Sequence, residues 1–87
     1  MRVHNMRSQH YNLVPNQFVI QCDNGDEVFQ SYSTVIAKRS QGKVILDSMW
    51  DYSKTTGKYR NKFLGESKAE TERKIKSGEY KVENLNG

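Results

Sequence analysis

The dipeptide Asn24-Gly25 constrains the fold of this 87-residue chain more than any other feature. It separates two apolar runs, and both residues tolerate the positive φ angles that a tight antiparallel hairpin requires. The first run repeats its apolar residues at a period of two, as a strand with one buried face does. Residues 17–22 and 28–39 are therefore predicted to form paired strands.

The strand predicted over 28–39 changes its apolar register along its length. A bulge or a strong bend near 31–33 would reconcile the two registers. A second tight turn at 40–42 then leads to a third strand over 43–47. Residues 17–47 thus predict a three-stranded antiparallel meander.

Residues 50–65 form an aromatic and basic segment with the sequence WDYSKTTGKYRNKFLG. Gly57 disfavours one helix across the whole segment, and a short helix over about 56–64 is predicted instead. Either of the two threonines before Gly57 would cap the start of this helix. The glycine at the end of the segment would terminate it.

A second helix is predicted over 66–77, where a Ser-x-x-Glu capping box opens the segment and a glycine follows it. Residues 79–85 alternate, which predicts a fourth strand with Tyr80 and Val82 turned inward. The predicted fold class is α+β. It consists of a small antiparallel β-sheet, made of the meander and the C-terminal strand, with one or two short helices on one face.

The chain is expected to form a single domain, because 87 residues suffice for one small core. Residues 1–14 have no clean period and are predicted to form a basic N-terminal arm. Only 34% of the residues are hydrophobic. A homodimer is therefore expected, since a second copy would enlarge the core and cover sheet edges.

The formal net charge of +4 favours an anionic partner, either nucleic acid or an acidic protein surface. The single cysteine, Cys22, excludes an intrachain disulfide and a thiolate metal cluster. The sequence also contains no apolar run long enough for a signal peptide or a membrane span. We therefore expect a cytoplasmic protein with no membrane association.

No catalytic, metal or cofactor site is predicted. The two histidines, His4 and His10, lie in the N-terminal arm, which would hold a general base poorly. Asp23, Asp26 and Glu27 cluster in one turn but lack the spacing of a calcium loop. No set of histidines and cysteines has zinc-site spacing. The protein is therefore predicted not to be an enzyme.

Cations interleaved with aromatic rings favour nucleic-acid binding, because rings stack on bases and cations neutralise phosphates. Trp50, Tyr59 and Phe63 are expected in the core, since so small a domain needs large apolar side chains. Tyr52 and Tyr32 are better candidates for exposed rings. The predicted nucleic-acid-binding residues are Lys38, Arg39, Tyr52, Lys54, Lys58, Arg60 and Lys62.

Three hydroxyl residues, Ser53, Thr55 and Thr56, are further candidates for phosphate contacts. A Thr-Thr-Gly turn that opens a helix offers hydroxyls and backbone N–H groups to an anion. Helix capping would explain the same residue types and is the stronger interpretation.

Three segments of the sequence resemble a known group of proteins: FQSYSTVIAKR at 29–39, WDYSKTTGKYRNKFLG at 50–65 and KIKSGEY at 74–80. They resemble a family of small uncharacterised proteins from tailed phages of the T4 type, over most of the chain from Val14 onward. In size and charge the chain is also similar to the phage inhibitor of the ToxIN toxin–antitoxin system. That likeness implies a basic, RNA-associated dimer in the host cytoplasm that neutralises an endoribonuclease toxin. It carries over no binding residues.

Two functions remain open from the sequence. The first is a non-enzymatic counter-defence protein that binds RNA through its basic residues and inhibits a host toxin–antitoxin endoribonuclease. The alternative is an inhibitor of another host defence or regulatory protein that does not bind nucleic acid. In that case the acidic turn at 23–27 would matter as much as the basic residues. Only the first function predicts an affinity for nucleic acid that falls steeply with salt.

Overall fold

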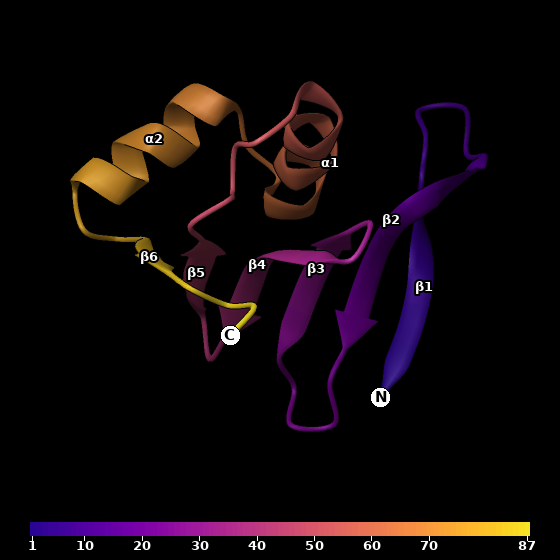
Figure 1. The fold of residues 1–87 in the computed structure, drawn as a ribbon, viewed down its shortest axis with the longest axis horizontal. Coiled ribbons are helices and arrows are strands. Elements are labelled where there is room, and N and C mark those ends of the chain that lie inside the picture. The colour runs from indigo at the N-terminus through magenta and orange to yellow at the C-terminus, as the bar shows by residue number, and fades with distance from the viewer.

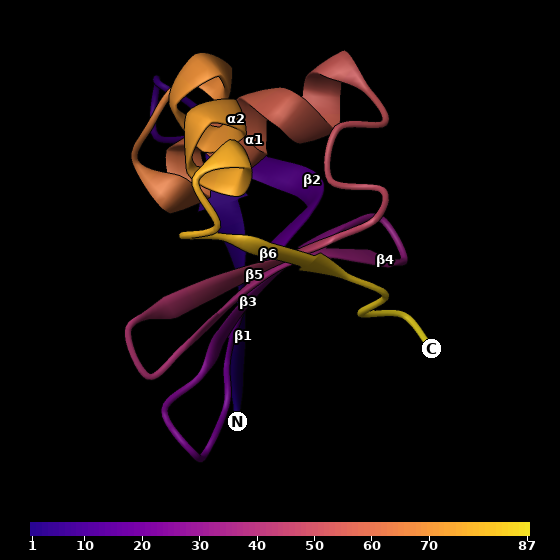
Figure 2. The ribbon, with the colours of Figure 1, turned by 90° about the vertical axis from the view of Figure 1, so that its left-hand side faces the viewer.

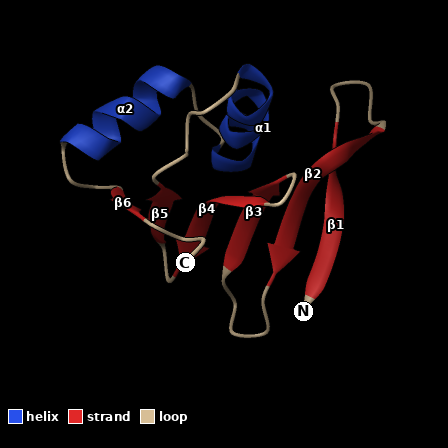
Figure 3. Cartoon of the chain, viewed as in Figure 1, coloured by secondary structure: helices blue, strands red, loops and turns tan.

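Six strands form one sheet in the order of the chain, β1-β2-β3-β4-β5-β6. The computed structural model describes residues 1–87, and both helices lie on one side of the sheet (Figures 1 and 2). The α+β class is confirmed, with a larger sheet than the four strands predicted (Figure 3). The strands are β1 (Arg2–Arg7), β2 (Leu13–Gln21), β3 (Glu27–Ser31), β4 (Thr34–Ser40), β5 (Lys43–Asp47) and β6 (Lys81–Glu83), and the helices are α1 (Lys54–Leu64) and α2 (Lys68–Lys76).

The hairpin predicted at Asn24-Gly25 is confirmed, and it joins β2 to β3. The Cys22 N–H donates to the Asp26 carbonyl over 2.8 Å. Gly25 has a φ of 94°, whereas Asn24 is not in the positive-φ region. The Asn24 side-chain oxygen instead accepts a hydrogen bond from the Asp26 N–H at 3.0 Å. One left-handed residue, rather than two, is therefore enough to close this turn.

The single strand predicted over 28–39 is wrong, because the chain reverses at Tyr32 and forms β3 and β4. Tyr32 has a φ of 56°, and Ser31 pairs with Thr34 across the turn. A further irregularity follows Phe29, where the β3–β4 register shifts. The change of apolar register in the sequence is thus a hairpin rather than a bend within one strand.

Residues 1–14 do not form an arm, since most of this segment belongs to the sheet. β1 is an edge strand that pairs antiparallel with β2. Between Asn5 and Arg7 the register shifts, because β2 inserts extra residues there, Pro15 among them. The β3 ladder begins only at Gln17. Pro15 therefore lies where β2 does not need its backbone N–H for pairing.

β6 runs parallel to β5, so the sheet is mixed and not wholly antiparallel as predicted. α1 and α2 form the crossover that a parallel pair of strands requires. The strand predicted over 79–85 is limited to the three residues of β6. Tyr80 is buried as predicted, but Val82 is 42% exposed and does not face the core.

The core lies between the sheet and the helices. Phe29 in β3 stacks on Phe63 in α1, with ring centroids 5.8 Å apart. As predicted, Tyr59 is buried, while Trp50 and Phe63 pack against the core from its edge. The buried apolar residues are Met6, Phe29, Ile36, Ala37, Leu46, Tyr59 and Tyr80.

The segment after β6 is tied to the sheet by polar contacts. The Asn86 side chain accepts from the Val35 N–H at 2.8 Å and donates to the Val35 carbonyl at 2.9 Å. The buried Asp47 carboxylate accepts from the backbone N–H groups of Met49 (2.9 Å) and Leu85 (2.7 Å). Burial would raise the pKa of Asp47, but these hydrogen bonds outweigh it and hold the pKa below its usual value.

Glu66, in the loop between the helices, anchors α2 to the chain that enters β6. Its carboxylate accepts hydrogen bonds from the hydroxyls of Tyr80 (2.8 Å) and Thr71 (2.6 Å). It also accepts one from the Lys74 ammonium at 2.9 Å. Burial would raise the pKa of Glu66, but these donors together hold it below its usual value. The hydrogen bond to Glu66 raises the pKa of Lys74 to about 12.

We expect Glu66→Gln to lower the free energy of unfolding at pH 7 by about 2 kcal/mol, because hydrogen bonds to a charged acceptor are the stronger ones. Folding lowers the pKa of Glu66. The contribution of its carboxylate to the free energy of unfolding is therefore present above the usual pKa of 4.5. That contribution is lost as the pH falls through the lower, folded value. Urea unfolding from pH 7 to pH 2 should therefore show a weaker pH dependence in the variant.

Glu72→Gln is the matched control for this experiment, because Glu72 is exposed on α2 and forms no ion pair. It should leave both the stability at pH 7 and its pH dependence close to those of the unchanged protein. An identical pH dependence in Glu66→Gln and the unchanged protein would contradict the prediction.

Candidate nucleic-acid interface

α1 carries a row of three lysines that we call the lysine stripe: Lys54, Lys58 and Lys62. They are four residues apart, which places successive side chains on one side of a helix. All three are exposed. None of them belongs to an ion pair, since the paired cations are found elsewhere. The positive charge of the lysine stripe is therefore not compensated within the protein.

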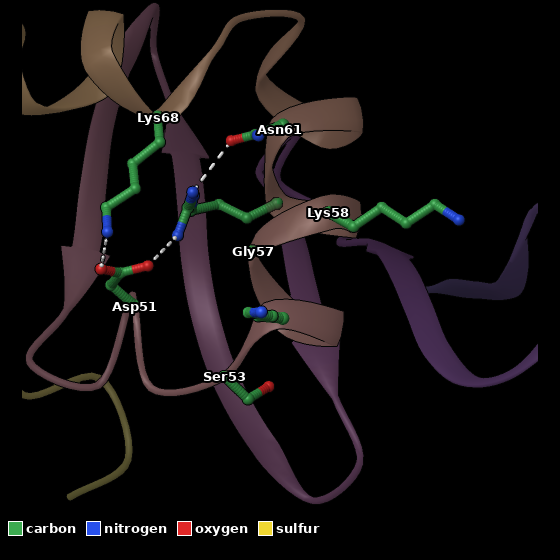
Figure 4. Close-up of a pocket in the computed structure, with 8 residues that line it drawn as sticks. Asp51, Ser53, Gly57, Lys58, Asn61 and Lys68 are labelled. Atoms are coloured by element: carbon green, nitrogen blue, oxygen red, sulfur yellow. Dashed lines mark hydrogen bonds and ion pairs between the residues drawn. The ribbon is translucent and has the colours of Figure 1, made fainter.

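A hollow of about 620 Å³ lies beside the lysine stripe, and no hydrophobic residue lines it. Figure 4 shows Lys68, the first residue of α2, reaching the carboxylate of Asp51, at 2.7 Å. This hydrogen bond, with a second from Arg60, holds the pKa of Asp51 below its usual value. Lys54 and Lys58 of the lining are unpaired, so positive charge exceeds negative charge there, which makes this polar hollow suitable for an anion. Its lining residues are Asp51, Ser53, Lys54, Gly57, Lys58, Arg60, Asn61 and Lys68.

Arg60 is not a surface cation, because its side chain is only 1% exposed. Its guanidinium donates to the Trp50 carbonyl at 2.9 Å and lies over the Trp50 ring at 4.9 Å. It also donates to the side-chain oxygens of Asp51 (3.1 Å) and Asn61 (2.9 Å). The guanidinium also packs against Gly57, where an added Cβ would lie 3.5 Å away, at ordinary contact distance. Arg60 therefore braces α1 against the preceding loop. The prediction that Arg60 lies on an exposed basic face and contacts nucleic acid is wrong.

α1 begins two residues earlier than predicted, and Ser53 rather than a threonine is its N-cap. The Thr56 N–H donates to the Ser53 hydroxyl at 3.1 Å. Thr56 is fully buried, and its hydroxyl lies 2.9 Å from that of Ser31, so it cannot reach an external phosphate. Thr55 is exposed on the first turn of α1. Gly65 ends the helix as predicted, with a φ of 71°.

Lys38 and Arg39 do not join the lysine stripe. They are adjacent on β4, so their side chains point to opposite faces of the sheet. Lys38 lies 3.5 Å from the Asp26 carboxylate, and Arg39 pairs with Glu27 at 3.0 Å. Arg39 also donates to the Phe63 carbonyl at 3.1 Å. The one basic face expected from the sequence is therefore divided, and two of its cations are neutralised by the acidic hairpin turn.

One comparison with known proteins found a match over most of the chain. The model of a family of unknown function, DUF8033, matches residues 1–79. The chain belongs to the DUF8033 family. Both helices and the first five strands lie within the match, and so does the lysine stripe. No curated protein and no solved structure matches this DUF8033 chain.

Two further observations on this DUF8033 protein concern membrane spans and metal sites. Neither helix has the length and apolar character that would be needed to cross a membrane. No three side chains of histidine, cysteine, aspartate or glutamate gather closely enough to hold a metal ion.

The two rings predicted to be exposed, Tyr52 and Tyr32, are exposed in the DUF8033 chain, and so is Tyr11, which was not predicted. Tyr52 is 43% exposed and Tyr32 is 54% exposed. Tyr52 directly precedes the N-cap Ser53, so it lies close to the polar hollow. Tyr32 lies in the β3–β4 turn, away from α1 in the sequence and outside the lining of the polar hollow.

The sequence analysis missed two cations of this surface, Lys68 and Arg7. Lys68 lies in a segment predicted as a helix, and its partner Asp51 is in another segment. The Lys62 ammonium donates to the carbonyl of Arg7, which brings the end of the lysine stripe against β1. The sequence carried one signal for Lys68. Asp51 is the one acidic residue of 50–65, so it is the position in that segment where a cation from another segment could form an ion pair.

Proposed function

We propose that this protein binds RNA through the lysine stripe and the polar hollow. The observation that carries the proposal is that Lys54, Lys58 and Lys62 form a row of exposed cations with no acidic partner. A row of cations suits the regular charges of a phosphate backbone and needs no base-specific contact. Lys68, which pairs with Asp51, also lines the polar hollow, and Tyr52 adds an exposed ring close by.

In the setting implied by the likeness to small tailed-phage proteins, RNA binding would serve counter-defence. The protein would act without catalysis in the host cytoplasm and would inhibit a host toxin–antitoxin endoribonuclease. The support for this role is the net charge of +4 together with the uncompensated cations of α1.

The test is a binding assay with purified, nuclease-treated protein against short single-stranded RNA and duplex DNA at increasing salt. We expect the logarithm of the RNA affinity to fall linearly with the logarithm of the salt concentration. Three phosphate contacts on a single strand predict a slope of about −2. An absence of RNA binding at low salt would discard the proposal.

A second candidate function is protein binding without nucleic acid, which the outer face of the sheet favours. Val3, Ile20 and Val28 are paired across three strands, on the face opposite to Phe29 and the helices. Val3 is 56% exposed. Such apolar surface suits a protein partner, and this function predicts no salt-dependent affinity for RNA. The expected homodimer stays a prediction, for which β1 and β6 each leave a sheet edge unpaired.

A further inference from the structure

A groove of about 420 Å³ separates the β1–β2 turn from α1, and it lies outside the polar hollow. We call it the turn groove. Met6 and Val19 give it apolar surface, while Arg7 and Lys62 give it positive charge. Two aromatic residues, Tyr11 and His4, also line it. An apolar groove with an aromatic ring and two cations has the composition of a site for a planar base beside its phosphates.

Tyr11 is held in place by backbone contacts rather than by packing of its ring. Its N–H donates to the Ser8 carbonyl at 2.9 Å, and the Arg7 guanidinium donates to its carbonyl at 2.8 Å. The Ser8 hydroxyl accepts from the N–H groups of His10 (3.2 Å) and Asn12 (3.3 Å). The turn is thus closely hydrogen-bonded, and it fixes the backbone from which the ring of Tyr11 projects.

The core does not account for a tyrosine at this position. Tyr11 is 79% exposed, more than any other large hydrophobic residue of the chain. Its φ is 63°, in the left-handed region that glycine and asparagine occupy more readily than aromatic residues. An exposed ring in an unfavourable backbone conformation contributes little to folding, which points to a role for Tyr11 in binding a ligand.

The turn groove is continuous with the lysine stripe through Lys62. Lys62 lines the groove, and its ammonium donates to the carbonyl of Arg7 on the groove's other side. Lys58 lies one helical turn before it. An RNA strand whose phosphates follow the lysine stripe would therefore reach the turn groove at the end of α1.

We propose that the turn groove binds one base of the RNA, stacked on Tyr11, while Lys58 and Lys62 hold the neighbouring phosphates. This inference rests on the proposed RNA binding and adds a base-recognising position to it. The lysine stripe alone reads charge and would bind any phosphate backbone. A stacked base makes the protein distinguish a strand with bases from a bare sugar-phosphate chain.

The test compares a ten-nucleotide single-stranded RNA with an abasic RNA of the same length, which has the same phosphates and no bases. One stacked base predicts that the unchanged protein binds the first RNA about ten-fold more tightly. Tyr11→Asn, which suits the left-handed backbone, should weaken binding of the first RNA by about ten-fold and leave binding of the abasic RNA unchanged. It should leave the slope against salt unchanged. Tyr11→Phe should keep the preference, because it keeps the ring.

Tyr32→Asn is the matched control, because Tyr32 is also an exposed tyrosine with a positive φ in a hairpin turn, and it does not line the turn groove. It should bind both RNAs as the unchanged protein does. Equal binding of both RNAs by the unchanged protein would overturn this inference alone. So would full affinity of Tyr11→Asn for the RNA with bases. Failure of the unchanged protein to bind either RNA would overturn the proposed function as well.

Discussion

Arg60→Ala is expected to lower the free energy of unfolding by about 3 kcal/mol, because a buried, hydrogen-bonded cation leaves both a cavity and unpaired partners. The Trp50 carbonyl would lose the guanidinium that bonds it, and the Trp50 ring would lose the cation above it. Arg60→Lys should also be destabilising, since an ammonium cannot replace a planar guanidinium that bonds Asp51 and Asn61 together. Urea unfolding at pH 7 measures both variants.

Lys58→Ala is the matched control for Arg60, because Lys58 is a cation on the same helix that is exposed and forms no ion pair. Its effect on the free energy of unfolding should stay within about 0.5 kcal/mol. A loss below about 1 kcal/mol for Arg60→Ala would show that the buried guanidinium is not the brace of α1 that its contacts indicate.

Lys54→Glu combined with Lys58→Glu is expected to weaken RNA binding by about 100-fold or more, because two phosphate contacts become repulsions. Both side chains are exposed, so the fold and its unfolding midpoint should be unchanged. The affinity is measured with the same single-stranded RNA at one fixed low salt concentration. Charge reversal at Arg60 would not serve this purpose, since it would disrupt α1 itself.

Lys43→Glu combined with Lys81→Glu controls for net charge. Both lysines are exposed, and they line a different cavity of the protein, at the β5–β6 edge of the sheet. This double variant has the same change in formal charge, so a purely global electrostatic effect would weaken RNA binding equally in both. Equal loss in the two double variants would contradict a site at the lysine stripe.

Local sequence signals predicted the parts of the fold that depend on neighbouring residues. Asn24-Gly25 predicted a hairpin, and the hydroxyl of Ser67 caps α2 by accepting from the Glu70 N–H. The β3–β4 hairpin was missed because Tyr32 carries no turn signal, although it adopts a left-handed conformation. β1 was missed because an edge strand with exposed polar residues shows little apolar alternation.

The candidate site was predicted in part for the same reason. Four-residue spacing is a local property, so the lysines of α1 could be grouped from the sequence alone. The burial of Arg60 depends on Asp51, nine residues earlier, and the neutralisation of Arg39 depends on Glu27, twelve residues earlier. A count of charges along the chain cannot detect such pairs, because they form only when the chain folds back on itself. Thr56 was misassigned similarly, since its hydroxyl partner Ser31 is distant in sequence.

The order of the strands also bears on how the molecule folds and opens. β1 to β5 are neighbours both in the chain and in the sheet, so each hairpin can close with little loss of loop entropy. The parallel pairing of β6 with β5 is different, because it closes a loop that contains both helices. The meander and the helical crossover are therefore two cooperative units, and closing the crossover loses more loop entropy than closing a hairpin of the meander. Opening of the crossover would carry the lysine stripe away from an intact meander, so an RNA bound, as proposed, to both the lysine stripe and the turn groove would oppose this opening.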